Sequence, residues 1–361
     1  MLVFIHHSSF IVFFILLALF PQFASAQARR KVIADEDAAG PGGSNLQAIM
    51  TLVQSPDVEP LGITVVSGDQ WRDDEVAQAL RLLEIVGRTD IPVVPGAAFP
   101  LVHTQQEAEA AESLYGKVSY MGAWDKRWWH EPFVIPDMPQ GRPTAKPSGE
   151  DAAHFMIRMV HQYPHQVTIY EGGPMTDLAL AIRLDPEFAG LAQELVFMGG
   201  SLNPQTDDPE WASDPRHEFN FWFDPEAAHI ALTASWAKIT CTPVDISIKT
   251  HFTRAMAEEI GHKGGALGQY WLKYYPTNID FMWDELAAAA WLDPSLITAE
   301  QLVYMDVNIE HGPNYGDTLT WHENDKPGLN VRPVHVQMDL NRALFERLFV
   351  KLMSSPTPGP R

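Results

Sequence analysis

The sequence predicts an α/β protein of one domain, with a mostly parallel, mixed central sheet covered by helices on both faces in a Rossmann-like arrangement. Three observations support this prediction. The chain has 361 residues, 46% of them hydrophobic, which is enough for one large core. Short β-branched runs alternate with stretches of helical period. The sequence contains no internal repeat and no interdomain linker.

The elements follow one another in strand–helix order. Val32–Ala34 reads as a strand that runs into an acidic turn. Ser44–Gln54 has a helical period, and its Ser-x-x-Gln start matches a capping box. Leu61–Val66 reads as a strand and Asp73–Val86 as an amphipathic helix. The remaining predicted strands are Ile91–Val94, Val167–Tyr170, Leu195–Met198 and Ile239–Thr242. This alternation predicts parallel strands with helical crossovers.

Three segments depart from the alternation. Residues 123–150 are rich in Trp, Pro and Gly and are predicted to form a long loop or lid. Residues 203–216 are predicted to form a similar loop with an acidic tip. Residues 354–361 are Pro-rich and are expected to be disordered. The folded domain is therefore expected to cover residues 27–353.

Residues 1–26 are expected to be a signal peptide. Ile11–Phe20 is almost purely apolar but short for a membrane span, Pro21 ends it, and Ala24-Ser25-Ala26 forms a small-residue cleavage motif. No Lys or Arg precedes the apolar run, which leaves an uncleaved anchor as the alternative. We expect an exported protein, periplasmic or secreted, with no membrane contact after cleavage.

The cysteine content and the net charge further restrict the compartment of the protein and the kind of partner it can bind. Cys241 is the only cysteine, so no intramolecular disulfide can form. The sequence contains no N-glycosylation sequon, which favours a bacterial periplasm. The formal net charge of -21 argues against a nucleic-acid partner, because no positive field would attract phosphates. It suits a protein that handles neutral small molecules or cations, although much of it can serve solubility alone.

Polar residues gather directly after the predicted strands, where ligands bind in open α/β sheets. Asp35, Glu36 and Asp37 follow the first strand, and three adjacent acids repel one another unless something compensates them. Calcium, which prefers carboxylate and carbonyl oxygens, is the simplest compensation. A solvated acidic turn and a phosphatase-type Asp-x-Asp site are the alternatives. Gly40–Gly43 lacks the ending of a phosphate-binding loop and reads as a tight turn.

Two later segments also carry candidate site residues. Glu218 and Asn220 lie two apart in a segment predicted to be extended, so both side chains face one side and can bind sugar hydroxyls. Asp224 precedes Pro225 and reads as a helix cap. Asp284 follows Trp283 at the start of an apolar run, where an aspartate is often only a cap.

Taken together, these segments resemble the inosine–uridine preferring nucleoside hydrolase family. Each match is short, but their order and spacing argue against chance. The resemblance implies a nucleoside hydrolase fold and hydrolysis of the N-glycosidic bond of ribonucleosides to ribose and free base. The matching segments are Val32–Asp37, Leu61–Gly68, Ile91–Ala97, Glu171–Ala181, Met198–Gly200, Glu218–Asn220, Asp224–Ala228 and Trp283–Asp284.

The resemblance also implies roles for individual residues. Asp37 is the expected general base, which activates a calcium-bound water for attack on C1′ of an oxocarbenium-like ribosyl group. The implied calcium ligands are Asp35, Asp37, Asn45, the backbone carbonyl of Thr176, and Asp284. The implied substrate-binding residues are Ser44, Asp69, Met175, Glu218, Asn220 and Trp283.

The sequence departs from the family pattern at the acidic motif. The motif usually ends in two adjacent aspartates, and Ser44 and Asn45 take those places here. Asp69 stands where many members have Asn, so it could restore one carboxylate. One interpretation is therefore that a negative charge has moved from the position of Ser44 or Asn45 to Asp69. The other is that the protein has lost metal binding.

The second departure concerns the leaving group. Trp283 stands where many members place a His that protonates the leaving base, and the indole cannot do so usefully. The purine-specific branch is similar in having Trp there, and stacking on the purine helps it leave. Trp124, Trp128 or Trp129 could complete an aromatic sandwich, or could simply anchor the long loop. Inosine, adenosine and guanosine are therefore expected to be preferred over uridine.

The leading prediction is an exported purine-salvage enzyme that binds calcium and a small nucleoside. One alternative is a nucleoside- or sugar-binding protein, or an inactive relative. The other is a hydrolase of a different N-riboside, since leaving-group contacts lie in variable loops. The resemblance also implies a homodimer or homotetramer.

Overall fold

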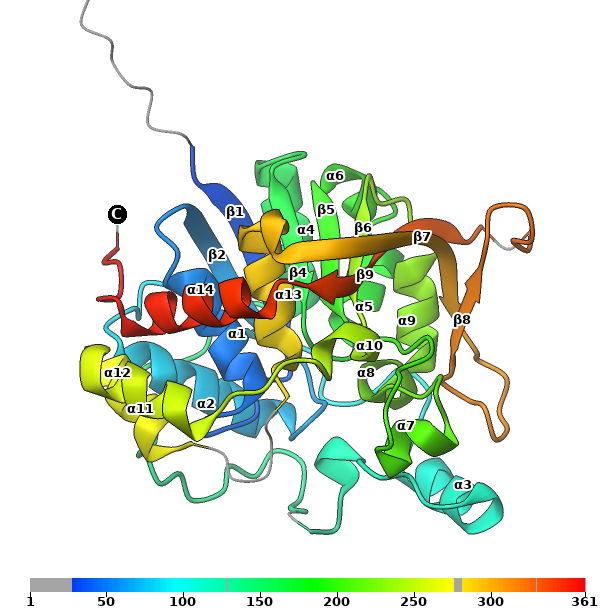
Figure 1. Ribbon diagram of the computed structural model, residues 1–361, viewed down its shortest axis with the longest axis horizontal. Coiled ribbons are helices and arrows are strands. Elements are labelled where there is room, and N and C mark those ends of the chain that lie inside the picture. Colours follow the sequence, from blue (N-terminus) through cyan, green and yellow to red (C-terminus); the bar gives the residue numbers. More distant parts are fainter. Residues whose placement is uncertain (1–27, 128, 276–280, 329, 361) are drawn as a thin grey trace, which may run out of the picture.

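The computed structural model describes residues 28–127, 129–275, 281–328 and 330–360 (Figure 1). The predicted signal peptide lies outside these residues. One nine-stranded sheet runs through the described part, in the order β3-β2-β1-β4-β5-β6-β9-β7-β8. The strands are β1 (Arg30–Glu36), β2 (Val58–Val65), β3 (Val93–Pro95), β4 (Val167–Glu171), β5 (Glu194–Met198), β6 (Ile239–Thr242), β7 (Ile297–Val307), β8 (Thr318–Trp321) and β9 (Arg332–Leu340).

The sheet is parallel from β3 across to β9 and antiparallel only around β7. Strand β1 pairs in parallel with both β2 and β4, and β6 pairs in parallel with β9. Strand β7 is antiparallel to β8 and to β9. The predicted mixed α/β sheet is therefore confirmed. All predicted strands are present, and the first continues through Glu36, so two of its three acids belong to the strand and not to a turn.

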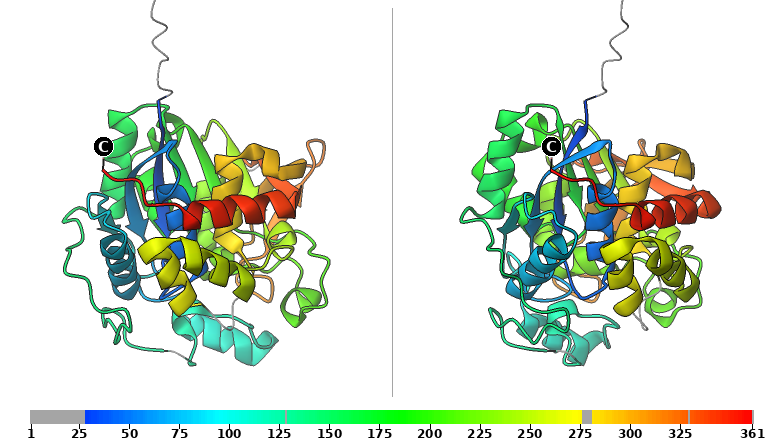
Figure 2. Two further views of the ribbon diagram at one scale, coloured as in Figure 1. Left: turned by 60° about the vertical axis from the view of Figure 1, so that its left-hand side comes forward. Right: turned by 90° about the vertical axis from the view of Figure 1, so that its left-hand side faces the viewer.

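Helices cover both faces of the sheet (Figures 1 and 2). Ile33 and Ile169 face α4, α5, α6 and α9, whereas Val32 and Ala34 face α1 and α13. On this second side α2, α11, α12 and α14 also pack into the core. The helices are α1 (Ser44–Val53), α2 (Arg72–Ile85), α3 (Gln105–Tyr115), α4 (Ala152–Gln162), α5 (Thr176–Leu184), α6 (Phe188–Leu191), α7 (Pro209–Ser213), α8 (Phe219–Phe223), α9 (Pro225–Leu232), α10 (Val244–Ser247), α11 (Arg254–Lys263), α12 (Gly265–Lys273), α13 (Trp283–Leu292) and α14 (Arg342–Ser354), with short 3-10 turns at Gly122–Trp124 and Pro294–Leu296. Among the described helices, none combines the length and apolarity needed to cross a bilayer.

The capping box predicted at Ser44 is wrong. Gly43 is the N-cap of α1 and no side chain caps the helix. The Ser44 hydroxyl instead donates to Glu285 Oε2 at 2.6 Å and accepts from the Asp284 backbone N–H at 3.3 Å. Packing of α1 against the start of α13 has therefore replaced the local cap.

The loop predictions are mostly confirmed. No helix or strand lies between Trp124 and α4, as expected for the long loop, in the residues described there. The second loop contains the short helix α7, because Asp208 caps it and Pro209 opens it. The described tail residues, 355–360, form no helix or strand, but the carbonyl of Pro358 accepts a hydrogen bond from Arg88 at 3.0 Å.

Candidate active site

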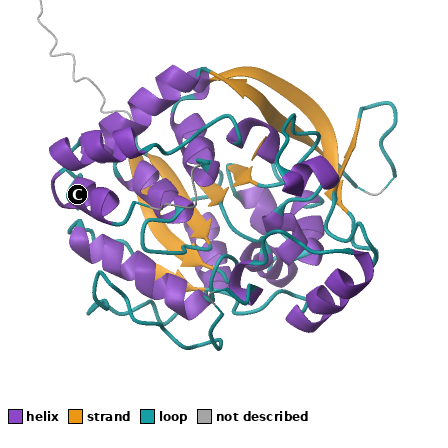
Figure 3. Cartoon of the chain, turned by 60° about the horizontal axis from the view of Figure 1, so that its bottom comes forward, coloured by secondary structure: helices purple, strands orange, loops and turns teal. Residues whose placement is uncertain are grey.

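The polar side chains meet where the parallel strands end, at the end of the sheet turned forward in Figure 3. Asp35 on β1 is in register with Thr64 on β2 and with Glu171 on β4, so the residues that follow these strands lie side by side. Helix α13 begins in the same region. The Tyr170 hydroxyl donates to the carbonyl of Asp284, in the first turn of this helix, at 2.7 Å.

Asp37 lies at the centre of this region and is 1% exposed. Its Oδ1 accepts from the Asn45 side chain at 2.6 Å, and its Oδ2 accepts from the Asp69 backbone N–H at 2.9 Å. Burial raises the pKa of Asp37 well above its usual range, and the nearby charges of Asp69, Glu75 and Asp284 raise it further. A cation bound beside Asp37 would oppose this shift, because it favours the ionised carboxylate.

Asn45 lies between two strand-end acids. Its amide nitrogen is within hydrogen-bond distance of Glu36 Oε2 at 3.0 Å, Asp37 Oδ1 at 2.6 Å and the Gly172 carbonyl at 3.2 Å. The predicted role of Asn45 is to offer its amide oxygen to calcium. In this arrangement the nitrogen faces the acids, so that role requires the amide to turn over.

The donor chemistry of the site fits a hard cation. Glu36 Oε1 and Asp284 Oδ1 are buried and have no hydrogen-bond partner, which is costly for carboxylate oxygens. Oxygen donors of this kind are the ligands that calcium prefers. No group of three or more His, Cys, Asp or Glu side chains in the described ranges has the geometry to hold a metal. The buried carboxylates are thus suitable calcium ligands, but they are not arranged as a complete set of ligands around one point.

Asp35, a predicted calcium ligand, faces a different set of groups. Its pKa is raised to about 6 by burial, and the side chains that interact with it are those of Glu171, Thr64 and Asp177. Because alternate strand residues point to opposite faces, Asp35 and Glu36 lie on opposite sides of the sheet. The structure therefore does not bring Asp35 to the Asn45 side of the site.

Asp69 contacts the site mainly through its backbone. Its N–H donates to Asp37, while its Oδ1 accepts from the Tyr120 hydroxyl at 2.8 Å. Burial raises the pKa of Asp69 to about 6, and the Tyr120 hydrogen bond counteracts this shift.

Glu218 and Asn220 do not lie in an extended segment, so that prediction is wrong. Glu218 is the N-cap of α8: its Oε1 accepts from the N–H of Asn220 at 2.8 Å, and its Oε2 accepts from Gly200 at 2.9 Å and Phe221 at 3.1 Å. The Asn220 amide donates to the carbonyls of Gly172 at 3.2 Å and Met198 at 3.3 Å. Asn220 and Asn45 therefore share the Gly172 carbonyl, which places Asn220 next to the Asp37 region.

The start of α5 lies against α9. Thr176 donates through its hydroxyl to Asp224 Oδ2 at 2.7 Å, and the buried Met175 is the N-cap residue of α5. Asp224 also accepts from the Ala227 N–H at 3.1 Å, which confirms it as the cap of α9.

Trp283 is half-buried, and its nearest tryptophan is one that the sequence patterns did not single out. The ring of Trp211, on α7, lies 5.6 Å from that of Trp283, and Phe281 lies 5.2 Å from it. Trp211 is 7% exposed and its indole nitrogen has no hydrogen-bond partner. In the sequence, only the position of Trp211 inside an otherwise polar loop could have indicated that it belongs to the site.

Of the three tryptophans that could complete a sandwich with Trp283, the two described ones, Trp124 and Trp129, have no ring contact with it. Trp124 is 2% exposed and stacks on Phe223 at 4.4 Å, so it anchors the long loop. Trp129 is 42% exposed, and Trp128 lies outside the described residues.

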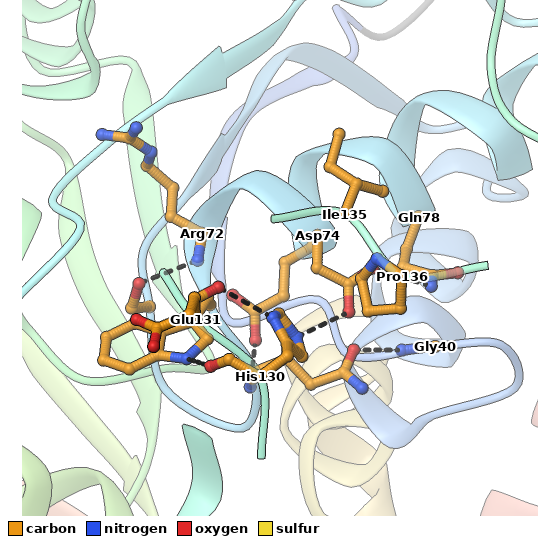
Figure 4. A network of polar contacts seen from close by, with 12 residues as sticks. Gly40, Arg72, Asp74, Gln78, His130, Glu131, Ile135 and Pro136 are labelled. Carbon is orange, nitrogen blue, oxygen red and sulfur yellow. Dashed lines mark hydrogen bonds and ion pairs between the residues drawn. The ribbon is translucent and has the colours of Figure 1, made fainter. Parts of the chain in front are cut away.

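The long loop is fastened to α2 by polar contacts (Figure 4). The Trp71 indole donates to the His130 carbonyl at 2.8 Å, and His130 Nε2 lies 3.7 Å from Asp74 Oδ2. The Glu84 carboxylate accepts from the backbone and hydroxyl of Thr144 farther along the loop, at 2.6 and 2.7 Å. These contacts hold the loop next to the site.

Residues 32–347 match the model of the inosine-uridine preferring nucleoside hydrolase family. The chain belongs to this family. Nucleoside hydrolases cleave N-glycosyl bonds, so the protein is a hydrolase of this class, and the family uses a metal ion. The predicted family, enzyme class and fold are confirmed.

Relatives with different substrates resemble this nucleoside hydrolase. It is 27% identical to the inosine-uridine preferring nucleoside hydrolase of Leishmania major over 87% of this chain and 94% of that one. It is 32% identical to uridine nucleosidase 1 of Arabidopsis thaliana over 65% of this chain and 62% of that one. The solved purine-preferring ribonucleoside hydrolase of Gardnerella vaginalis shares the fold, with a TM-score of 0.69, 23% identity, and coverage of 90% of this chain and 98% of that one.

Proposed function

We propose that this nucleoside hydrolase acts on purine ribonucleosides, with Asp37 as general base and calcium as its metal. The observation that carries the proposal is the shared carbonyl of Gly172, which accepts from both Asn45 and Asn220. Through this one peptide group, the proposed base Asp37 lies next to Asn220, which can hold ribose.

The residues proposed to hold calcium are Asp37, Asp284, Asn45 after rotation of its amide, and the Thr176 carbonyl. Asp284 supports this because its Oδ1 is buried without a partner. When bound, calcium supplies positive charge that favours ionised water and an ionised Asp37. Asp35 lies on the far side of the sheet with Glu171 and Asp177, and it is not among the residues proposed to hold calcium.

In the proposed reaction the Asp37 carboxylate accepts a proton from the attacking water. The water oxygen bonds to C1′ of the ribose while the bond from C1′ to the base nitrogen breaks. The leaving base keeps the electron pair and takes up a proton from solvent, and Asp37 afterwards releases its proton to solvent. The buried carboxylates stabilise the positive charge that develops on the ribosyl ring. Asn220 and Glu218 bind ribose hydroxyls through oxygen lone pairs that their backbone contacts leave available. The other residues proposed to bind the substrate next to the ribose are Ser44, Asp69 and Met175.

The purine preference rests on the aromatic wall of Trp283 and Trp211. Flat bases stack on such rings, and each stacked base contributes about 1–3 kcal/mol. A purine offers a larger stacking surface than a pyrimidine, so kcat/KM for inosine, adenosine and guanosine should exceed that for uridine. Equal or faster turnover of uridine would reject the preference while leaving the enzyme class intact.

The decisive experiment measures free ribose from inosine, adenosine, uridine and nicotinamide riboside, with calcium and with chelator. We expect release from purine nucleosides that depends on calcium and is lost in Asp37→Ala. Asp177→Ala is a matched control, since Asp177 is equally buried but belongs to the Asp35 side. Release that survives Asp37→Ala would remove the base assignment. Nucleoside binding without release would indicate a binding protein, and faster release from nicotinamide riboside would indicate another N-riboside as substrate.

We further propose that the protein is exported after cleavage before Gln27 and assembles as a homodimer or homotetramer. N-terminal sequencing of the secreted or periplasmic protein tests the first proposal, and light scattering tests the second. An intact N-terminus or a monomer at micromolar concentration would contradict them.

A further inference from the structure

We infer that Glu36 supplies, from the end of β1, the carboxylate toward the cation that Asn45 cannot supply from α1. The inference rests on the proposed use of calcium at this site. It names a residue outside the predicted ligand set and explains how the chain can lack both aspartates at Ser44 and Asn45 without losing the negative charge of the site.

The side chain of Glu36 reaches the position that the missing carboxylate would serve. Glu36 is the last residue of β1 and points to the face covered by α1 and α13, as Ala34 does two residues earlier. Its Oε2 accepts from the Asn45 amide at 3.0 Å. The Glu36 carboxylate, at the end of β1, thus contacts Asn45, the residue of α1 that stands in place of an aspartate.

The Glu36 carboxylate is buried, and only one of its two oxygens has a hydrogen-bond partner. It is 0% exposed, and its Oε1 has no hydrogen-bond partner. A buried carboxylate oxygen without a donor costs free energy unless a cation or a proton compensates it. Asp284 Oδ1 is in the same condition at the start of α13. Burial raises the pKa of Glu36, and the charge of Asp284 is the next largest cause, so the two carboxylates lie near each other.

Gly172 provides the space that Glu36 occupies. A Cβ atom at position 172 would lie 2.2 Å from Glu36 Oε2. The carbonyl of the same residue accepts from Asn45 and Asn220. The backbone at Gly172 therefore accommodates the Glu36 carboxylate on the side of the site that also holds Asn220.

The two other candidates for the relocated charge do not contact Asn45 through their side chains. Asp69, the replacement expected from the sequence, accepts from the Tyr120 hydroxyl at 2.8 Å. Asp35 faces Glu171 and Asp177 across the opposite side of the sheet. Glu36 alone among these three contacts Asn45 directly.

The test compares the purified whole protein with Glu36→Gln, which keeps the shape and removes the charge. Calcium affinity, measured by titration calorimetry, should fall by at least about tenfold. Glu171→Gln is the matched control, because Glu171 is equally buried and lies on the Asp35 side. It should leave calcium affinity unchanged.

A spectroscopic measurement separates a direct ligand from a residue that only orients Asn45. Europium(III) substitutes for calcium, and its luminescence decay in H2O and D2O counts the waters on the ion. Glu36→Gln should add a bound water, and the double variant Glu36→Gln with Asn45→Asp should restore both the water count and the affinity. An unchanged water count in Glu36→Gln would overturn the inference.

The outcomes also separate this inference from the proposed function. Unchanged calcium affinity in Glu36→Gln, with ribose release still dependent on calcium, rejects Glu36 alone. Ribose release that continues in chelator, from a protein that binds no calcium, rejects calcium and the inference together. Calcium binding without ribose release from any tested nucleoside rejects the proposed reaction and leaves Glu36 to be judged by the water count.

Discussion

The Asn45 amide nitrogen lies 2.6 Å from Asp37 Oδ1, so a residue at the start of α1 holds the proposed base at the end of β1. The Asp69 N–H holds the other oxygen of the same carboxylate. The Asp69 donor lowers the pKa of Asp37 and so opposes the burial that raises it. A donor such as the Asn45 amide also favours the ionised form of a carboxyl group.

Asn45→Leu keeps the approximate volume of the side chain but removes the donor to Asp37. We expect the pKa of Asp37 to rise further, so the acid limb of the kcat profile moves to higher pH, and we expect the protein to lose about 1–3 kcal/mol of stability from acceptors left unpaired. Rate–pH profiles and urea unfolding measure both effects. Gln205, exposed in the loop before α7, provides the control Gln205→Leu. A pH profile identical to that of the wild type would contradict the role given to Asn45.

Trp211→Ala removes the ring that lies against Trp283. We expect kcat/KM for inosine to fall by about 5- to 150-fold, the equivalent of about 1–3 kcal/mol of stacking, with a smaller loss for uridine. Trp129→Ala is the control, since Trp129 is 42% exposed and has no described contact with Trp283. Equal losses for the two nucleosides would show that Trp211 supports α7 without reading the base.

Stability without calcium should decrease as the pH rises. Burial raises the pKa of Asp35 to about 6 and that of Glu285 to about 8, both above their unfolded values of 3.8 and 4.5. The folded protein therefore holds protons that the unfolded chain releases, and this stability is present at low pH and lost between about pH 4 and about pH 8. Urea unfolding in chelator at pH 5, 6, 7 and 8 should show a falling midpoint. A midpoint that rises over this range would contradict the assignment.

Gly172→Ala places a Cβ atom 2.2 Å from Glu36 Oε2. We expect a loss of about 1–3 kcal/mol from overpacking, together with a lower calcium affinity because Glu36 is displaced. Thermal unfolding with and without calcium measures both. Gly149→Ala is the control, since a Cβ at Gly149 meets no atom within 4 Å. If Gly172→Ala behaved like this control, the close packing around Glu36 would be disproved.

The sequence predicted the sheet well because its buried strands are short, β-branched and regularly separated by helical stretches. It did not predict β7, β8 or β9, since many residues of β7 and β9 are exposed or half-buried and these strands lack an apolar signature. Local patterns also misplaced Ser44, where a contact with Glu285 replaced the expected cap.

The candidate site was predicted only in part, for a related reason. Asp37 and Asp284 could be located because they follow or begin regular elements. The contacts of Glu36 and Trp211 depend on α1 and α7 folding back over the strand ends, and no pattern within the sequence encodes that proximity. Sequence proximity groups Asp35 with Asp37, although Asp35 faces Glu171 and Asp177.

Strand β9 lies between β6 and β7 in the sheet, although it is the last of the nine strands to be synthesised. As the chain leaves the ribosome, β6 therefore has an open edge until Leu340 has emerged, and α14 can pack over α1 only after that. Most of the chain must be made before the native state is available. A nascent chain with this strand order exposes an unpaired strand edge for longer, and chaperones can protect that edge during the interval.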